Sequence, residues 1–515
     1  MPEPDGPAAG RRGGDARTER RIAAWLAACA ALVYLPFCHG HLTGTDEVGV
    51  FVTTKSLWED GDLAIGPGNH VFEGRDGRLY SIFAIGQSVL ALPFYAVGDL
   101  AYRSLPPAWV ARALGRTPEG VVDTFETPQI FAVTLYPPLA SGALVGLFFL
   151  FQRRLGASRR SALWATAVLG GSTYAAMMSV YFLQHTTESL AILGALYALV
   201  GFRQGGRLRD LAAGSLLGCL TLLIRVPSTV AGPALAAYLV FALAQRARAP
   251  GGLPPLARVA AAVALPAAAV AAVHVGINLS KWGTWLGSPM LDQSKFLTTP
   301  LRVGITGLLV SPGSSLFVYS PPLLLLPFTL RSFWRTHRAE CLTALAVLAS
   351  LLLLAAPFQL WHGMWSCPGP RMLFAATPLL MLPLGPWLDT HRSRPWRVAV
   401  ALLGVTGAAV QLGLLTAKWR SVVDVMGSRH HQPPFGFLFE PALSPALACL
   451  RALWRGDTDV WLIDLLRGVP GREPAPEIAA AALVAWAAAL VFCALRLRRA
   501  AAADGAGAPR EPWLR

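Results

Sequence analysis

Two adjacent carboxylates, Asp46 and Glu47, follow the first long apolar run of the chain after only a few residues. An ionisable residue at a membrane boundary is costly unless it is solvated or partnered, which makes it a candidate functional group. A carboxylate placed there can act as a general base and take the proton of an acceptor hydroxyl. The alternative for Asp46 is an ordinary acidic residue of a loop. We assign the base to Asp46, with Glu47 beside it as a second catalytic candidate.

Several basic side chains predicted at the same face are candidates for binding a phosphate. An Arg side chain can bind phosphate through two hydrogen bonds and stabilise the charge that develops on a phosphate leaving group. Arg371 and Arg225 are the leading candidates, followed by Lys55 and Arg78. For Arg225, which lies two residues before Pro227, the alternative is a side chain that extends to the lipid head groups. One or two acids with several cations suit the transfer of a sugar from a phospholipid carrier.

Aromatic and imidazole side chains complete the predicted site. Trp side chains can stack on a sugar ring, although an aromatic belt at the membrane interface is the alternative for any one Trp. The substrate-binding candidates are Tyr80, His185, Glu188, Trp361, His362 and Trp365.

His185 and Glu188 are three residues apart, so a helix would place them on one face. Helix capping by the intervening Thr residues, with Glu188 in the first turn, is the alternative explanation. No third metal ligand with convincing spacing accompanies the pair, and none of the seven cysteines forms a CxxC motif. The sequence therefore indicates no cofactor and no disulfide framework, and a divalent metal stays an open alternative that no ligand spacing supports.

The composition indicates the elements that must hold these residues. Of 515 residues 54% are hydrophobic and only 14% are charged, with a mean hydropathy of +0.48, which is typical of a polytopic all-α protein of the inner or plasma membrane. The net charge of +15 comes mainly from short Arg clusters between apolar runs. Such clusters are topology signals, so we expect no nucleic-acid partner.

The apolar runs predict twelve to thirteen transmembrane helices. An Arg cluster ahead of the first helix indicates a cytoplasmic N-terminus, so the loop with the acid pair lies outside. The run 83–102 either crosses the membrane or is re-entrant, because a crossing would place the Arg cluster at 153–160 outside. The predicted segments are a disordered cytoplasmic tail (1–21), a transmembrane domain (22–417) that includes the first external loop (41–82), an extracytoplasmic segment (418–474), a last transmembrane helix (475–499) and a cytoplasmic tail (500–515).

Six stretches in order carry a family resemblance. They are the acid pair Asp46–Glu47 and the runs GRLYSIFAIGQSVLALPFYAVG (77–98), GSLLGCLTLLIRVPS (214–228), NLSKWGTWLGSP (278–289), SPGSSLFVYSPPLLL (311–325) and WHGMWSCPGPRMLFAATPLL (361–380). Together they resemble the integral-membrane glycosyltransferases of fold class C, which include the protein mannosyltransferases and the bacterial aminoarabinose transferase.

The resemblance implies a polyprenyl-phosphate sugar donor, a catalytic acid at Asp46 in the first external loop, and Arg371 facing the donor phosphate. The sequence departs from the family at three places. The Lys-Pro-Pro element of many members is replaced by YSIFAIGQ, the nearest second acid is Glu73, and Ser314 and Ser315 stand where Arg and Gly are more familiar.

The preferred interpretation is a glycosyltransferase that moves a sugar from a polyprenyl-phosphate carrier to an extracytoplasmic acceptor of the cell envelope, which is a glycan, a lipid or a protein. A transporter or flippase is the first alternative, but it predicts charged residues along the spans, whereas here they gather at one face. A non-catalytic protein that binds a lipid-linked glycan or acts as a scaffold is the second. The altered family elements favour this second alternative.

Overall fold

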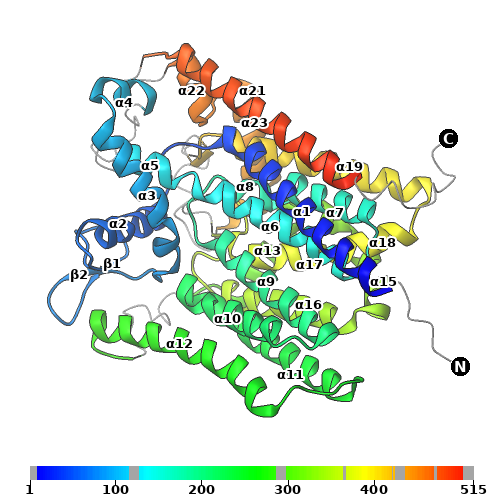
Figure 1. The fold of residues 1–515 in the computed structure, drawn as a ribbon. Helices are drawn as coiled ribbons and strands as arrows, with labels where there is room; N and C mark the ends of the chain where they lie inside the picture. The colour runs from blue at the N-terminus through cyan, green and yellow to red at the C-terminus, as the bar shows by residue number, and fades with distance from the viewer. Residues whose placement is uncertain are drawn as a thin grey trace, which may run out of the picture.

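The computed structural model describes residues 8–114, 127–285, 297–363, 367–419, 422–423, 435–468 and 473–502. Within these ranges the regular structure is helical except for one antiparallel hairpin, β1 (Val71–Glu73) and β2 (Leu79–Ser81), in which Phe72 pairs with Tyr80. The hairpin lies beside α2 (Thr45–Glu59), outside the main bundle of helices (Figure 1). The prediction of an essentially all-α membrane protein is thus confirmed at this level.

Eight helices in the described ranges are long and apolar enough to cross a membrane, fewer than the twelve to thirteen crossings predicted. Several other apolar runs form shorter helices, such as α7 (Arg159–Ser172) and α10 (Leu208–Ile224), and a crossing helix needs about 20 residues. The eight candidate spans are Ala16–Phe37, Thr127–Arg154, Val226–Arg248, Leu256–Trp282, Arg338–Ala355, Arg371–Thr390, Arg394–Thr416 and Pro476–Ala502.

The ambiguous run 83–102 forms α3 (Gly86–Ser104), which is not one of the eight candidate spans. It contains Pro93 and packs against α2 and against α5 (Thr127–Val133). Figure 1 shows these three helices together at one end of the molecule. The limits of the predicted segments stay predictions, although α1 (Ala8–Tyr34) begins inside the segment assigned to a tail.

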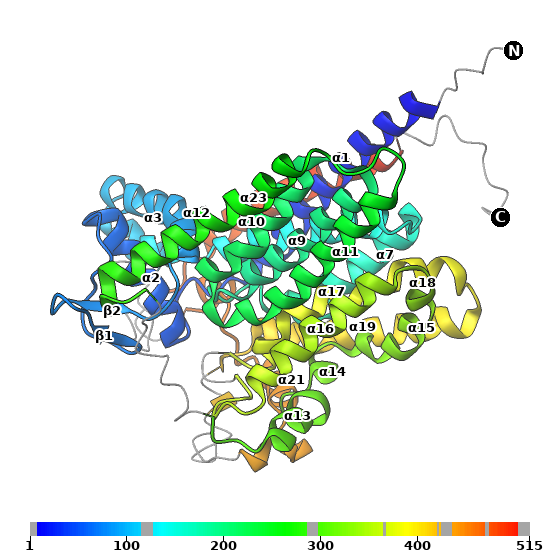
Figure 2. The same ribbon diagram turned by 90° about the horizontal axis from the view of Figure 1, so that it is seen from below.

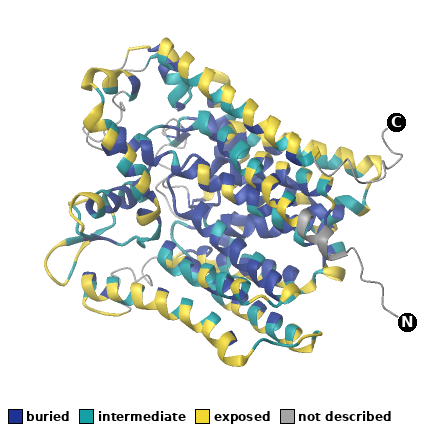
Figure 3. Ribbon diagram, in the orientation of Figure 1, coloured by how far each residue is buried: buried dark blue, intermediate teal, exposed yellow. Residues whose placement is uncertain are grey.

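Helix α1 packs along α6 (Tyr136–Arg154) in the bundle. The contact is close because a Cβ atom at Gly146 would lie 2.7 Å from the carbonyl oxygen of Ala23. The buried core occupies the middle of the molecule (Figure 3). Two long helices, α12 (Leu256–Trp282) and α23 (Pro476–Ala502), lie on opposite flanks and are mostly exposed (Figures 1 and 3). Their exposed apolar side chains fit contact with lipid.

The two ends of α1 differ in character. Near its start, Glu19 pairs with Arg153 at 3.1 Å and with Arg159 at 2.9 Å. At its other end the chain passes through η1 (Leu35–Phe37) to α2, which carries the acid pair. The hairpin, α2 and α3 therefore lie far from both described ends of the chain, as a view from below also shows (Figure 2).

Candidate active site

The first turn of α2 carries both predicted catalytic acids. Gly44 precedes the helix with an extended backbone, and Asp46 and Glu47 follow in the first turn, where the helix dipole favours negative charge. Adjacent residues of a helix point about 100° apart. The two carboxylates therefore meet different neighbours, although they look equivalent in the sequence.

Asp46 forms a partly buried ion pair with Arg371. Its Oδ2 accepts a hydrogen bond from Arg371 Nη1 at 2.7 Å, and its Oδ1 lies 3.5 Å from His70 Nε2. Burial acts to raise the pKa of Asp46, but the charges of Arg371 and His70 outweigh it and lower the pKa below its usual 3.8. The side chain is 19% exposed. Asp46 is therefore ionised at neutral pH and still within reach of a ligand.

The backbone around Arg371 places its side chain. Arg371 begins η7 (Arg371–Ala376), and its N–H donates to the carbonyl oxygen of Gly369 at 2.9 Å. Gly369 has φ +91°, and a Cβ atom there would lie 2.7 Å from the rings of Tyr174 and Tyr319. Only Gly is compatible with this turn. Arg371 Nε is buried and has no hydrogen-bond partner among the described residues.

The Glu47 carboxylate accepts hydrogen bonds from three backbone N–H groups and one hydroxyl group. Its Oε2 accepts hydrogen bonds from the N–H and the hydroxyl of Thr43 at 2.6 and 2.9 Å and from the N–H of Gly44 at 3.2 Å. Its Oε1 accepts from the N–H of Phe182 at 2.6 Å. Burial raises the pKa of this carboxyl. Glu47 thus joins the start of α2 to the segment before α9 (His185–Gly205).

A second carboxylate group lies at the start of α9. Glu188 Oε2 is 3.2 Å from His185 Nδ1 and 3.5 Å from Arg225 Nη1, and the Glu188 side chain is only 1% exposed. Arg225 follows the last residue of α10. The predicted pairing of His185 with Glu188 on one helix face is therefore present, and Arg225 completes it.

The two carboxylate groups adjoin each other. Arg225 Nη2 lies 2.9 Å from the sulfur of Met372, the residue after Arg371. Burial and the charge of Arg225 lower the pKa of His185 to about 4, so this imidazole is neutral at pH 7. The charges of Arg371 and Asp46 act on Arg225. We name the resulting cluster the carboxylate–arginine centre; its members are Asp46, His70, His185, Glu188, Arg225 and Arg371. It brings two arginines and two histidines around one buried and one partly exposed acid, and the two guanidinium groups offer positive charge to an anion.

Three other predicted residues lie in or near the first external loop with different partners. Lys55 is 4.0 Å from Glu59, one turn further along α2. Arg78 is half exposed and pairs with Asp62 at 2.5 Å. Tyr80 donates its hydroxyl to Asp76 at 2.7 Å. None of these three contacts joins the carboxylate–arginine centre.

Trp361 and His362 lie in the core beside the centre. Both are fully buried, and their rings contact Phe439 and Phe435 respectively. Neither ring presents a face to solvent in the described part of the structure, whereas stacking on a sugar requires an exposed ring face. Trp365 lies outside the described residues.

Two residues of the site region were missed by the sequence analysis. His70 contacts Asp46 and has φ +59°, an uncommon conformation for a residue other than Gly. Lys281, at the end of α12, donates to the carbonyl oxygen of Ser81 at 2.6 Å and is 5% exposed. Within the described ranges no carboxylate pairs with Lys281. In the sequence, a Lys at the end of a long apolar run and next to Trp282 is the signal that could have identified Lys281.

No protein-family model and no curated protein matches the sequence. Among solved structures the fold is similar to ArnT from Cupriavidus metallidurans bound to undecaprenyl phosphate, with a TM-score of 0.45 and 15% identity over 95% of this chain and 78% of that chain. The apo state of the same protein gives the same TM-score and identity over 97% and 79%.

The archaeal oligosaccharyltransferase AglB from Archaeoglobus fulgidus, in complex with an inhibitory peptide and a dolichol-phosphate, gives a TM-score of 0.44 and 10% identity. The match covers 81% of this chain and 59% of AglB. ArnT and AglB are membrane glycosyltransferases of fold class C, the group that the sequence motifs resemble. Identities of 15% and below describe a similarity in fold alone.

Proposed function

We propose that the protein transfers a sugar from a polyprenyl-phosphate carrier to an extracytoplasmic acceptor of the cell envelope. The observation that carries this proposal is the pairing of Asp46 with Arg371, two residues 325 positions apart, directly beside Glu188 and Arg225. Such a centre offers a carboxylate for the acceptor and guanidinium groups for the carrier phosphate. The six sequence stretches that resemble the fold-class-C transferases support the same reaction.

In the proposed reaction Asp46 Oδ1, which lies 3.5 Å from His70 Nε2, receives the proton of the acceptor hydroxyl. The acceptor oxygen then forms a bond to the anomeric carbon of the sugar. The bond between that carbon and the phosphate oxygen breaks, and its electron pair leaves with the polyprenyl phosphate. Arg371 and Arg225 stabilise the charge that develops on this leaving group. Glu47 and Glu188 act as positioning residues, because they hold the start of α2 and Arg225.

The ion pair between Asp46 and Arg371 also couples donor binding to base strength. Arg371 lowers the pKa of Asp46 in the free protein, which makes it a weak base. A phosphate that binds Arg371 offsets part of this positive charge. The pKa of Asp46 then rises, so Asp46 becomes a stronger base when the donor is present.

The test is release of polyprenyl phosphate from a panel of polyprenyl-phosphate sugars by the detergent-purified protein. Asp46→Asn keeps the side-chain shape and removes the base, and we expect transfer to fall by about a hundredfold to ten-thousandfold. Arg371→Ala removes a phosphate contact, and we expect donor binding to weaken strongly and release to fall to a low residual rate. The matched controls are Asp60→Asn at the exposed end of α2 and Arg103→Ala on α3, which should keep full activity.

Thermal unfolding of each variant separates lost chemistry from lost folding. Retention of wild-type release in folded Asp46→Asn would refute the assignment of the base. Donor binding by the wild type without release from any donor in the panel would favour the non-catalytic binding protein over the transferase.

A further inference from the structure

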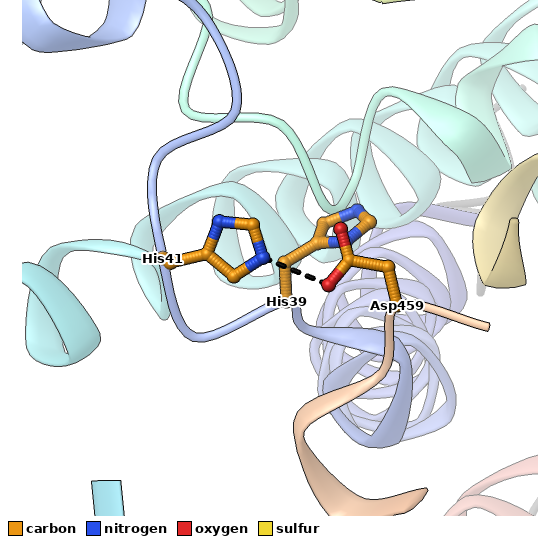
Figure 4. A group of neighbouring side chains, drawn as sticks. All are labelled: His39, His41 and Asp459. Atoms are coloured by element: carbon orange, nitrogen blue, oxygen red, sulfur yellow. Dashed lines mark hydrogen bonds and ion pairs between the residues drawn. The ribbon is translucent and has the colours of Figure 1, made fainter. Parts of the chain in front are cut away.

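A second cluster of potential ligands joins the two halves of the sequence outside the carboxylate–arginine centre. His39 and His41 lie in the segment between η1 and α2, and Asp459 lies between α21 (Pro445–Arg455) and α22 (Trp461–Arg467). The two oxygens of Asp459 face different rings, with Oδ2 3.3 Å from His39 Nδ1 and Oδ1 2.8 Å from His41 Nε2. Figure 4 shows both imidazoles turned toward the carboxylate. The three ligand atoms all lie within 4.8 Å of one another.

The environment of His39 indicates that this cluster is more than a hydrogen-bonded pair. Its side chain is 1% exposed, and neither ring nitrogen makes a hydrogen bond of ordinary geometry within the described part of the chain. One face of the ring packs against Tyr181, with ring centroids 5.3 Å apart. A buried polar group without a partner costs about 1–3 kcal/mol in typical proteins. A ligand bound to a ring nitrogen of His39 would therefore stabilise the protein.

Backbone contacts hold both sides of the cluster in place. The N–H of Asp459 donates to the carbonyl oxygen of Thr416 at 2.8 Å, and the N–H of Trp461 donates to that of Cys38 at 3.0 Å. The backbone next to each set of ligands is therefore already positioned before any ion binds. A preformed site of this kind binds an ion without a large ordering cost.

We propose that His39, His41 and Asp459 bind one divalent transition-metal ion with the ligand preference of Zn²⁺. Two imidazole nitrogens and one carboxylate oxygen are typical zinc ligands, and bonds of about 2.0–2.1 Å in tetrahedral geometry place neighbouring ligand atoms about 3.3 Å apart. The separations of 3.3 and 2.8 Å from Asp459 to the two rings are close to that spacing. Three protein ligands leave a fourth position for water.

The bound ion would connect the segment before α2 to the segment before α22, across 418 positions of sequence. Thr43 and Gly44, which hold Glu47, follow His41 within three residues, so the ion would stabilise the start of the helix that carries Asp46. The role of the bound ion is thus structural, and the ion takes no part in the chemistry of the proposed transfer reaction.

The test measures metal binding directly on the full chain in detergent. The protein is stripped with a chelator, loaded with Zn²⁺, desalted and analysed for metal content, and a parallel sample is loaded with Co²⁺ for its visible spectrum. We expect one Zn²⁺ per chain, the d–d bands of a four-coordinate Co²⁺ site, and a higher unfolding temperature with Zn²⁺ than without it.

His39→Gln and Asp459→Asn should each lose the bound ion and the Zn²⁺-dependent rise in unfolding temperature. Two controls should retain both: His391→Gln, near α18 (Leu384–Thr390), and Glu188→Gln, which alters the other buried His–carboxylate pair. Wild-type protein that binds no stoichiometric Zn²⁺ would overturn the proposal whether or not the variants fold. Binding that persists in His39→Gln and Asp459→Asn would overturn it as well.

Discussion

The two ends of α9 each bury a glutamate beside an arginine, but only one end has the features of a ligand site. At its start Glu188 contacts His185 and Arg225 and adjoins the Asp46–Arg371 pair. Near its end, 15 residues or about 22 Å further along the helix, Arg203 pairs with Glu340 at 2.8 Å. Tyr238 also donates to Glu340 at 2.6 Å.

The difference lies in how many charged and polar side chains each cluster joins and in the exposure of its acids. The Glu340 group has one acid and one cation, the Glu340 side chain is 0% exposed, and its contacts join α9, α11 (Gly232–Arg248) and α16 (Arg338–Ala355). The carboxylate–arginine centre joins two acids, two arginines and two histidines, and the Asp46 and His70 side chains are 19% and 35% exposed. An isolated pair around a fully buried acid therefore indicates a packing contact, whereas a larger cluster of arginines, histidines and acids with a partly exposed carboxylate indicates a ligand site.

The largest expected effect tests this division. Glu340→Gln leaves the partly buried Arg203 without its charged partner. Loss of one partner of a fully buried pair costs about 3–5 kcal/mol, so we expect the free energy of unfolding to fall by at most this amount. Sugar transfer per folded molecule should stay near wild type, which is the reverse of the pattern expected for Asp46→Asn. Thermal unfolding in detergent and the release assay measure the two quantities. Glu477→Gln, in a half-exposed pair with Arg112, is the control. Loss of transfer in folded Glu340→Gln would remove the distinction between the two ends of α9.

A smaller effect is expected from Gly369→Ala. The added Cβ atom meets Tyr174 and Tyr319 and places Ala at φ +91°, which costs about 1–3 kcal/mol and shifts Arg371. Donor binding should weaken together with stability. Gly436→Ala, where φ is not positive and no atom lies within 4 Å of the added Cβ, should leave both unchanged. Unaltered donor affinity in Gly369→Ala would show that the turn does not place Arg371 for the phosphate.

The pH dependence sharpens the role of Asp46. Its pKa in the folded protein lies below the usual 3.8, so the ion pair contributes its full stabilisation above that pH and loses it as the pH falls through the lowered value. We expect the release rate to show no loss from this group between about pH 5 and 7. In Arg371→Ala the guanidinium is absent, so the acid limb of any residual activity should move to higher pH. An acid limb at the same pH in both proteins would contradict the coupling.

The smallest effect is expected at Arg78. This side chain is half exposed and pairs with Asp62, and exposed ion pairs contribute little. Arg78→Ala should change donor binding by less than about threefold, which corresponds to under 1 kcal/mol in typical surface pairs. A loss as large as that of Arg371→Ala would place Arg78 in the phosphate site after all and extend the centre into the first external loop.

Much of the candidate site could be predicted from residue type and position relative to the apolar runs. Asp46, Arg371, Arg225, His185 and Glu188 were all singled out in this way. Among the described residues, eight helices meet the length and hydropathy of a membrane span, fewer than the twelve to thirteen predicted crossings, because hydropathy along the sequence does not show where a helix ends. The helices α7 and α10 have only 14 and 17 residues and are not among the eight.

The sequence by itself determined the class of protein, because the hydrophobic content and the long apolar runs require a helical membrane protein. It also indicated that Asp46 follows the first span, but it predicted a loop there, and the helix that begins at Thr45 is known only from the structure. Only the tertiary structure decided which charges meet. Asp46 and Arg371 are 325 residues apart, and His41 and Asp459 are 418 apart, so no local spacing could reveal either pair. The tertiary structure also separated Asp46 from Glu47, since adjacent helix positions face different parts of the fold, and one faces Arg371 while the other binds backbone N–H groups.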